Sequence, residues 1–315
     1  MKIQIIPCLL TVALAAAPGV IQAQPDAHYV PGIEGIECAT LPPPGWYFRD
    51  YNVFYLGEKL NNGAGNNYAP AGFQAMVYAT VPRAIYISDF KVLGGYLGGD
   101  VVLPFVYGSY RNAPSPAGLV SGSTFGMGDF YGETTLSWHP GQFDIGFAAG
   151  FWAPTGNSSG PPQTQPGSGF WTPELTLGAT WHPDEAKTWA ISALNRFEFC
   201  NSEYQNPEFT GDVTPGDAWT LEWGISKKVI KTIDVGVVGY YQQRVTASTG
   251  TASMGGVQFT GEQLFPYSRV AAFGPEVNVF IPCIKLWTQI RYNYEFMADN
   301  RAQGHTIALV LTKAF

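Results

Sequence analysis

Charged and polar residues that could line a pore or form ion pairs recur at every second position of several apolar segments. Between Ile284 and Phe296 the even positions are apolar or aromatic apart from Thr288, whereas most odd positions are polar or charged. A period of two predicts a β-strand with one apolar face and one polar face. Other segments alternate in the same way. Together they predict a set of residues on the polar face: Asp129, Glu133, Glu174, Arg196, Glu198, Glu222, Arg244, Glu276, Gln289, Arg291 and Glu295.

These carboxylates and guanidinium groups have two interpretations, and the sequence leaves both open. They could line a water-filled pore and set its ion selectivity. Alternatively, they could pair with one another and fill a narrow barrel, since charges hidden from lipid still need partners.

The four histidines are the other candidates for chemistry. None of them is spaced from another as metal ligands are, and His139 and His182 each stand in a Trp-His-Pro sequence typical of a turn beside an interfacial tryptophan. A lipid hydrolase needs a serine beside a histidine and a third group that orients it. His305 is followed by Thr306 and by no serine. We therefore predict no catalytic residue, no metal and no cofactor.

The length of the alternating segment indicates a membrane strand. It covers about thirteen residues, whereas strands of soluble proteins usually have about five or six. A lipid-facing Arg291 near the midplane would cost roughly 2 to 4 kcal/mol, so the polar face must point inward. No apolar run after residue 23 approaches the roughly 20 residues of a membrane helix. A chain that spans without helices forms a closed barrel.

Export is predicted by the N-terminus, where Met1–Ala23 has the charge, apolar run and cleavage site of a secretory signal peptide. Aromatic residues make up 15% of the chain and charged residues 13%, which suits strands with aromatic girdles. The net charge of −7, with no basic cluster, argues against nucleic acid as a partner. We predict an all-β protein in the outer membrane of a Gram-negative bacterium, with outer-membrane lipid around it.

The turn and loop signals predict a transmembrane antiparallel β-barrel of twelve strands over 45–315, with both termini on the periplasmic side. The repeated Trp-His-Pro sequences mark two periplasmic turns 43 residues apart. Pro82 predicts irregular pairing within one strand, and 111–124 is predicted to be an outer loop. The domain boundaries are 1–23 for the signal peptide, 24–44 for an N-terminal periplasmic segment and 45–315 for the barrel.

The N-terminal segment and the cysteines raise a question of topology. Cys38 and Cys283 are predicted on the periplasmic side, whereas Cys200 begins an outer loop across an apolar band about 25 Å tall. A Cys38–Cys283 disulfide would pin the segment at the periplasmic rim, so that His28–Gly35 could act as a plug that partly occludes the inner mouth. Three free thiols and a loose segment are the alternative.

Two resemblances add to these expectations. The chain ends in alternating apolar residues, with Lys313 as an exception, and in Phe315, which resembles the assembly signal of bacterial outer-membrane barrels and implies the barrel-assembly machinery as a partner. Six motifs, in order and spacing, resemble the family described in connection with the meta-pathway of phenol degradation. They are His28–Gly35, Leu41–Gly45, Gly128-Asp129 leading to Trp138, Ala153–Gly156, Gly274–Glu276 and Tyr292–Phe296. Cys38 departs from that pattern.

The family resemblance implies an outer-membrane protein that moves aromatic or other hydrophobic compounds and has no catalytic residues. We therefore predict a porin-like channel for passive uptake of such small molecules. The alternatives are a plugged structural or adhesion barrel without transport and, less favoured, a lipid-modifying enzyme. An interior of Glu and Arg would suit a polar permeant equally well, so the sequence does not name the permeant.

Overall fold

The computed structural model describes residues 27–115, 118–159 and 164–315. The predicted signal peptide, 1–23, lies outside the described residues. Among the described residues, no helix is both long enough and apolar enough to cross a membrane.

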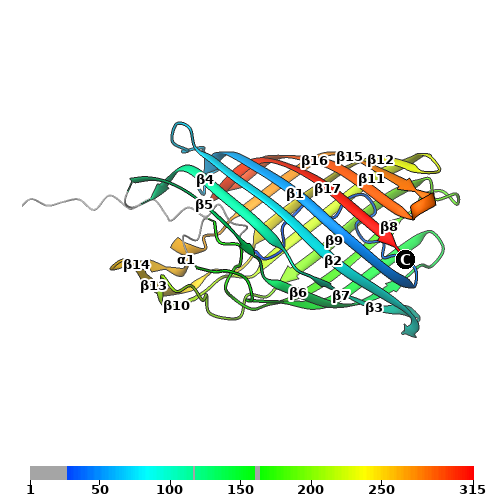
Figure 1. Ribbon diagram of the computed structural model, residues 1–315, viewed down its shortest axis with the longest axis horizontal. Coiled ribbons are helices and arrows are strands. Elements are labelled where there is room, and N and C mark those ends of the chain that lie inside the picture. Colours follow the sequence, from blue (N-terminus) through cyan, green and yellow to red (C-terminus); the bar gives the residue numbers. More distant parts are fainter. Residues whose placement is uncertain (1–26, 116–117, 160–163) are drawn as a thin grey trace, which may run out of the picture.

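Twelve antiparallel strands form a closed barrel (Figure 1), as the sequence predicted. The first strand, β1, pairs with the last, β17, on one side and with β2 on the other, so the ring is complete. In ring order the strands are β1 (Gly45–Asn61), β2 (Gln74–Val92), β3 (Gly95–Val102), β6 (Phe130–Trp138), β7 (Phe143–Ala153), β8 (Thr172–Trp181), β9 (Trp189–Glu198), β11 (Ala218–Ile230), β12 (Ile233–Arg244), β15 (Arg269–Ile281), β16 (Leu286–Asp299) and β17 (Arg301–Ala314).

Two further strands extend one part of the wall outward. The predicted loop 111–124 instead belongs largely to a hairpin of β4 (Phe105–Ser115) and β5 (Gly118–Met127). The outer half of β2 pairs with β4 and its inner half with β3. Pro82 stands at this change of partner, where a residue without an N–H is tolerated. The irregularity predicted at Pro82 is therefore a change of pairing strand.

The outer loops carry a small folded cap at the end of the barrel opposite the C-terminus (Figure 1). It contains β10 (Thr210–Thr214), β13 (Thr249–Met254), β14 (Val257–Thr260) and the short helix α1 (Gly261–Leu264). Its apolar core includes Phe170, Tyr204, Val213, Phe259 and Phe265. At the other end a 3₁₀ turn, η1 (Pro282–Ile284), precedes β16, so that strand begins two residues later than the alternation suggested.

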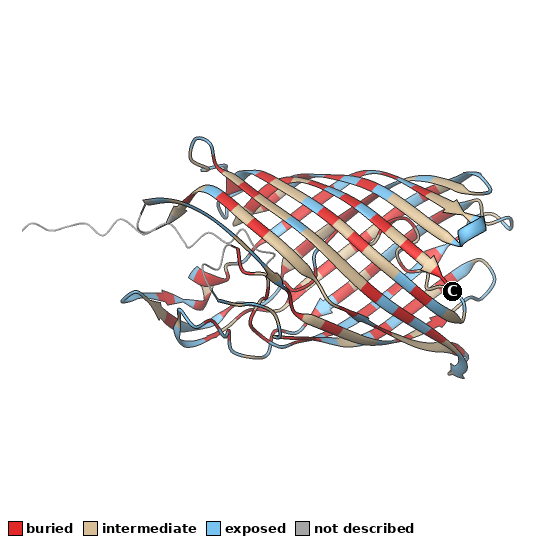
Figure 2. Cartoon of the chain, viewed as in Figure 1, coloured by how far each residue is buried: buried red, intermediate tan, exposed pale blue. Residues whose placement is uncertain are grey.

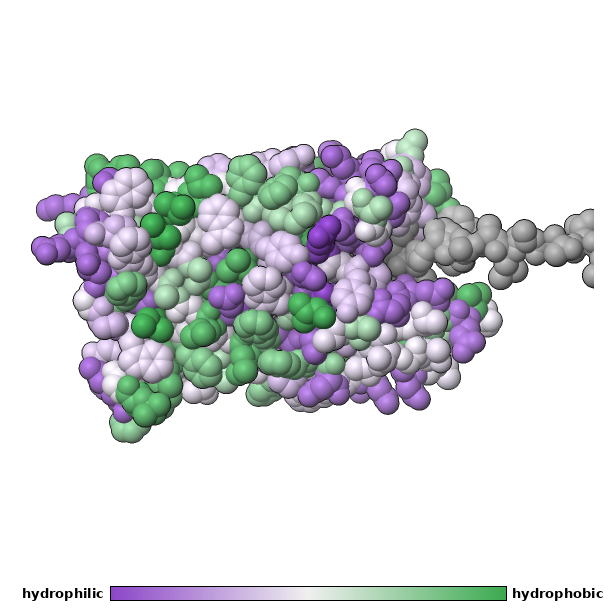
Figure 3. Space-filling view, turned by 180° about the vertical axis from the view of Figure 1, so that it is seen from behind, coloured by the Kyte–Doolittle hydropathy of each residue, from purple (hydrophilic) through white to green (hydrophobic). Residues whose placement is uncertain are grey.

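Burial alternates along the strands, as Figure 2 shows. In β16, Ile290 and Phe296 are more than half exposed, whereas Arg291 and Glu295 are 1% exposed. Exposed apolar and aromatic side chains form a band around the barrel, and hydrophilic residues gather at its ends (Figure 3). The apolar face therefore points outward, as a barrel surrounded by lipid requires, and the charged face points to the lumen.

Candidate functional site

The N-terminal segment, 27–44, runs through the lumen. At one end the ring of His28 contacts Thr172, at the outer end of β8. Towards the other end the hydroxyl of Thr40 donates to Asp144 at 3.1 Å, at the periplasmic start of β7. From the sequence we predicted a periplasmic segment in which His28–Gly35 could act as a plug at the inner mouth. The structure corrects this, because the segment finds hydrogen-bond partners along the length of the lumen.

Three buried carboxylates on the barrel wall hold the backbone of this segment. Extended backbone N–H groups inside a barrel need acceptors, and a carboxylate oxygen makes a strong one. The contacts are Glu198 with the N–H groups of His28 and Tyr29 at 2.8 and 3.1 Å, Glu222 with those of Gly32 and Glu34 at 2.6 and 3.3 Å, and Glu276 with that of Ile36 at 3.2 Å. These carboxylates bind the segment instead of facing open water.

Glu34 joins the segment to an ion-pair network in the middle of the lumen. Its carboxylate lies 3.0 Å from Arg49 Nη1 and 3.1 Å from Arg83 Nη1. Arg83 also lies 2.7 Å from both Asp100 and Glu133. A further pair in this layer is Arg196 with Glu174, at 2.7 Å. In this layer the charges are paired with one another, which agrees with the ion-pair interpretation of the polar face.

The eleven residues predicted on the polar face are all buried or partly buried. Several of their side chains contact the N-terminal segment or one another, whereas Arg244 donates to the carbonyl of Gly216 and lies over the ring of Phe265 in the cap. Nearer the outer end, Glu295 accepts hydrogen bonds from the hydroxyl groups of Tyr55 and Tyr240 at 3.0 and 2.9 Å. Arg291 Nε lies 3.2 Å from Glu276 and its Nη2 donates to Gln289 at 3.4 Å. The structure thus places the set inside the barrel, while its role in lining a pore stays a prediction.

Sequence reasoning missed Glu34, Arg49, Arg83 and Asp100. The inward face of β2 is mostly apolar, with Arg83 as an exception. Apolar and polar residues therefore do not alternate along this strand in a way that would mark its inward face. Glu34 lies in a segment without periodicity. The motif resemblance around His28–Gly35 was the one signal in the sequence that pointed to this part of the chain.

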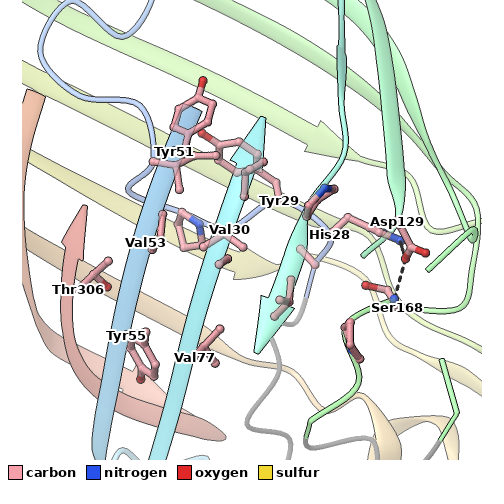
Figure 4. A pocket seen from close by; sticks show the side chains of 18 of the residues that line it. His28, Tyr29, Val30, Tyr51, Val53, Tyr55, Val77, Asp129, Ser168 and Thr306 are labelled. Atoms are coloured by element: carbon pink, nitrogen blue, oxygen red, sulfur yellow. Dashed lines mark hydrogen bonds and ion pairs between the residues drawn. The ribbon is translucent and has the colours of Figure 1, made fainter. Parts of the chain in front are cut away.

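An apolar cavity of about 190 Å³ lies between the segment and one side of the barrel wall (Figure 4). Valines of β1 to β4 form the wall side, and Tyr29, Val30 and Ile33 form the segment side. Polar and charged residues line the cavity as well, among them Arg83, Asp129 and Gln165. The lining side chains are Val53, Val77, Ala79, Val81, Val102 and Val106 on the wall.

The histidines fall into three environments. His28 is buried in the lumen. His139 and His182, from the two Trp-His-Pro turns, both contact Asp144, at 2.8 and 3.0 Å. His305 lies on the outside of the barrel wall, where its ring stacks on Tyr292. Among the described residues, no group of three or more His, Cys, Asp or Glu side chains is arranged to hold a metal ion.

The predicted Cys38–Cys283 disulfide is not formed, and all three cysteines in the described ranges are free thiols. Cys38 lies inside the lumen, where its Sγ is 3.4 Å from Ser192 Oγ. Cys283 is exposed in the η1 turn at the periplasmic end, and Cys200 is buried in the outer cap. The pairing was predicted because both cysteines were expected on the periplasmic side. It does not form because the N-terminal segment, with Cys38, lies inside the barrel and not along its rim.

Solved structures of outer-membrane barrels resemble this one. The COG4313 outer membrane channel from Pseudomonas putida F1 has a TM-score of 0.69 and 15% identity, with 91% of this chain and all of that chain covered. A Pseudomonas aeruginosa FadL homologue has a TM-score of 0.44 and 13% identity over 95% and 96% of the two chains. A mutant of the TodX monoaromatic hydrocarbon channel gives 0.46 and 9% over 87% and 91%.

No curated protein matches the chain in sequence. A family model does match, over residues 58–311, which is most of the chain and nearly all of the barrel. The motifs His28–Gly35 and Leu41–Gly45 precede the matched residues. The family resemblance is confirmed, and the chain belongs to the family described as "Putative MetA-pathway of phenol degradation".

Proposed function

We propose that this protein is a channel of the Gram-negative outer membrane for passive uptake of small aromatic or hydrophobic compounds. The observation that carries the proposal is the apolar cavity between the N-terminal segment and the valines of β1 to β4. An apolar wall stabilises an apolar solute by removing its surface from water, whereas it offers an ion no polar partner. The shared fold with the COG4313 outer membrane channel supports the proposal.

The size of the cavity favours single-ring compounds. A protein cavity of about 150 Å³ lined by apolar side chains accommodates benzene, and this one has about 190 Å³. Tyr51, Tyr131 and Trp152 border it, so a ring would meet aromatic side chains as well as valines. An apolar permeant is compatible with a charged lumen in this proposal, because charged residues at the cavity such as Glu34, Arg83 and Arg196 form ion pairs, and valines provide much of the remaining lining.

A closed structural barrel is the second candidate, and the N-terminal segment favours it. Contacts with Glu198, Glu222 and Glu276 tie the segment to three strands, which would keep a static lumen blocked. Passive uptake therefore requires that the segment shift, or that small compounds pass beside it through the cavity.

The channel and the closed barrel predict different results in a transport experiment. Val81→Trp would fill the cavity, whereas Val237→Trp, on the lipid face of β12, would not. Intact cells that lack other aromatic channels would be assayed for uptake of radiolabelled toluene. We expect the wild type and Val237→Trp to raise the uptake rate several-fold over cells without the protein, and Val81→Trp to abolish that increase. Equal uptake with and without the wild-type protein would favour the closed barrel.

A further inference from the structure

The imidazole of His28 occupies a site that fits an aromatic ring on its faces and at both nitrogens. Trp152 stacks on it with ring centroids 5.4 Å apart and planes inclined by 18°, and Phe170 meets it edge-on at 4.6 Å. Its Nε2 lies 3.0 Å from Asp129 Oδ2 and its Nδ1 lies 3.0 Å from Thr172 Oγ1. His28 is 8% exposed. Side chains from β7, from β8, from the residue that precedes β6 and from the cap thus converge on one ring.

Contacts that do not involve His28 hold the acceptor of this site in place. Asp129 Oδ1 accepts the N–H of Gly156 at 2.8 Å, and its Oδ2 accepts that of Ser168 at 2.6 Å. Figure 4 shows Asp129 and Ser168 joined beside His28 at the cavity. These bonds fix the direction of the carboxylate whether or not the imidazole is present.

The aromatic walls of the site are supported in the same way. Trp152 Nε1 donates to Glu174 at 2.9 Å, and its ring packs on Tyr131 at 4.5 Å. Phe170 belongs to the core of the outer cap, where it meets Phe265. The walls would therefore keep their shape if the His28 ring left.

The site is also continuous with the apolar cavity. His28, Asp129, Trp152 and Ser168 all line that cavity, together with the valines of the opposite wall. A ring that enters the cavity would therefore meet the His28 ring directly. Other contacts also hold this part of the segment: Glu198 accepts from the N–H groups of His28 and Tyr29, Gln242 donates to the carbonyl of Tyr29 at 2.9 Å, and the hydroxyl of Tyr29 donates to Glu222.

We propose that Asp129, Trp152, Phe170 and Thr172 form a recognition site for planar aromatic compounds that carry a hydroxyl or a ring N–H, with His28 as an internal occupant that such a ligand displaces. The inference rests on the proposed function and deepens it. The ring would stack on Trp152 and meet Phe170 edge-on, as the imidazole of His28 does. Its donor would bind the oriented carboxylate of Asp129, which gives preference over rings without a donor.

The tether of His28 sets how strongly it competes. A group on a short flexible chain acts at an effective concentration in the millimolar range, so the wild-type protein should bind small ring donors only weakly. Removing the ring should then tighten binding of a soluble substitute by about tenfold or more.

The test is complementation of the empty site with free imidazole at pH 8. His28→Gly would be titrated with imidazole by calorimetry, next to the wild type and to His305→Gly as a lipid-face control. We expect saturable binding to His28→Gly at least about tenfold tighter than to either other protein. At this pH 1-methylimidazole, which has no N–H, should bind His28→Gly several-fold more weakly than imidazole. Trp152→Leu in the His28→Gly background should remove the binding.

Absence of saturable binding to His28→Gly, in protein that retains its folded gel mobility, would overturn the inference. Equal affinity for imidazole and 1-methylimidazole would overturn the role of Asp129 as the recognition group. The outcome is separable from that of the uptake experiment. Imidazole binding without toluene uptake would keep the site and reject the channel, whereas uptake without imidazole binding would reject this site alone.

Discussion

Gly35 lies so close to Glu276 that a β-carbon at Gly35 would stand 2.0 Å from Glu276 Oε2. The carboxylate cannot easily retreat, because Arg291 Nε lies 3.2 Å from it and the N–H of Ile36 donates to it at 3.2 Å. The close approach of Gly35 thus lets the N-terminal segment lie against the wall of β15.

Gly35→Ala should therefore loosen the segment. The added methyl group would push Glu276 off its partners, and overpacking of this kind costs about 1 to 3 kcal/mol. We expect a higher conductance in planar bilayers and faster proteolysis at residues 27–44. Gly132→Ala in β6 is the matched control, since its nearest neighbour would be a ring carbon of Phe130 at 3.4 Å. Wild-type conductance in Gly35→Ala would show that the contact does not hold the segment.

Replacing Arg291 by Ala should shift ion preference toward cations. Glu276 would lose its buried partner, and the remaining carboxylates would dominate the field in the lumen. Reversal potentials in a salt gradient would measure the shift. Unchanged selectivity would contradict a pore-lining role for this face. Because an unpaired buried charge costs about 3 to 5 kcal/mol, Arg291→Ala with Glu276→Gln is the control, and it should recover stability and most of the original selectivity.

The three thiols should react very differently in the native protein. Cys283 is exposed, whereas Cys38 is inside the lumen and Cys200 is buried in the cap. Burial raises the pKa of the Cys200 thiol to about 12, so its reactive thiolate is scarce at neutral pH. We expect a maleimide reagent at pH 7.5 to label Cys283 within minutes and the other two only after unfolding. Peptide mapping without reductant that found a Cys38–Cys283 link would contradict this arrangement.

Deleting Phe315 should lower the amount of inserted protein and leave the conductance of each channel unchanged. Its side chain is 73% exposed, and its N–H donates to the carbonyl of Trp46 at 3.1 Å, so it adds little to the folded barrel. The resemblance to an assembly signal is the reason to expect an effect on insertion. Phe296→Ala removes another lipid-facing phenylalanine and serves as the control. Insertion of the truncated chain at the level of the control would show that Phe315 is no signal.

The barrel and the direction of its charged residues follow from local alternation. Arg196, Glu222 and Arg291 could be assigned to the lumen from parity alone, because a charge on the opposite face would meet lipid and its cost decides the orientation. The family resemblance likewise depends on short motifs that are readable in order along the chain.

Contacts between distant residues lie beyond that local pattern. The segment 27–44 has no periodicity, and its path is set by partners such as Glu276, which is 240 residues away from Ile36. The ring site of His28 likewise combines Trp152 of β7 with Asp129 and Phe170, which lie in two different connections. Alternation records which face of a strand meets lipid, but it carries no information on what fills the space inside. Folding settles that second question, since buried amides and carboxylates must find partners wherever the closed wall brings them together.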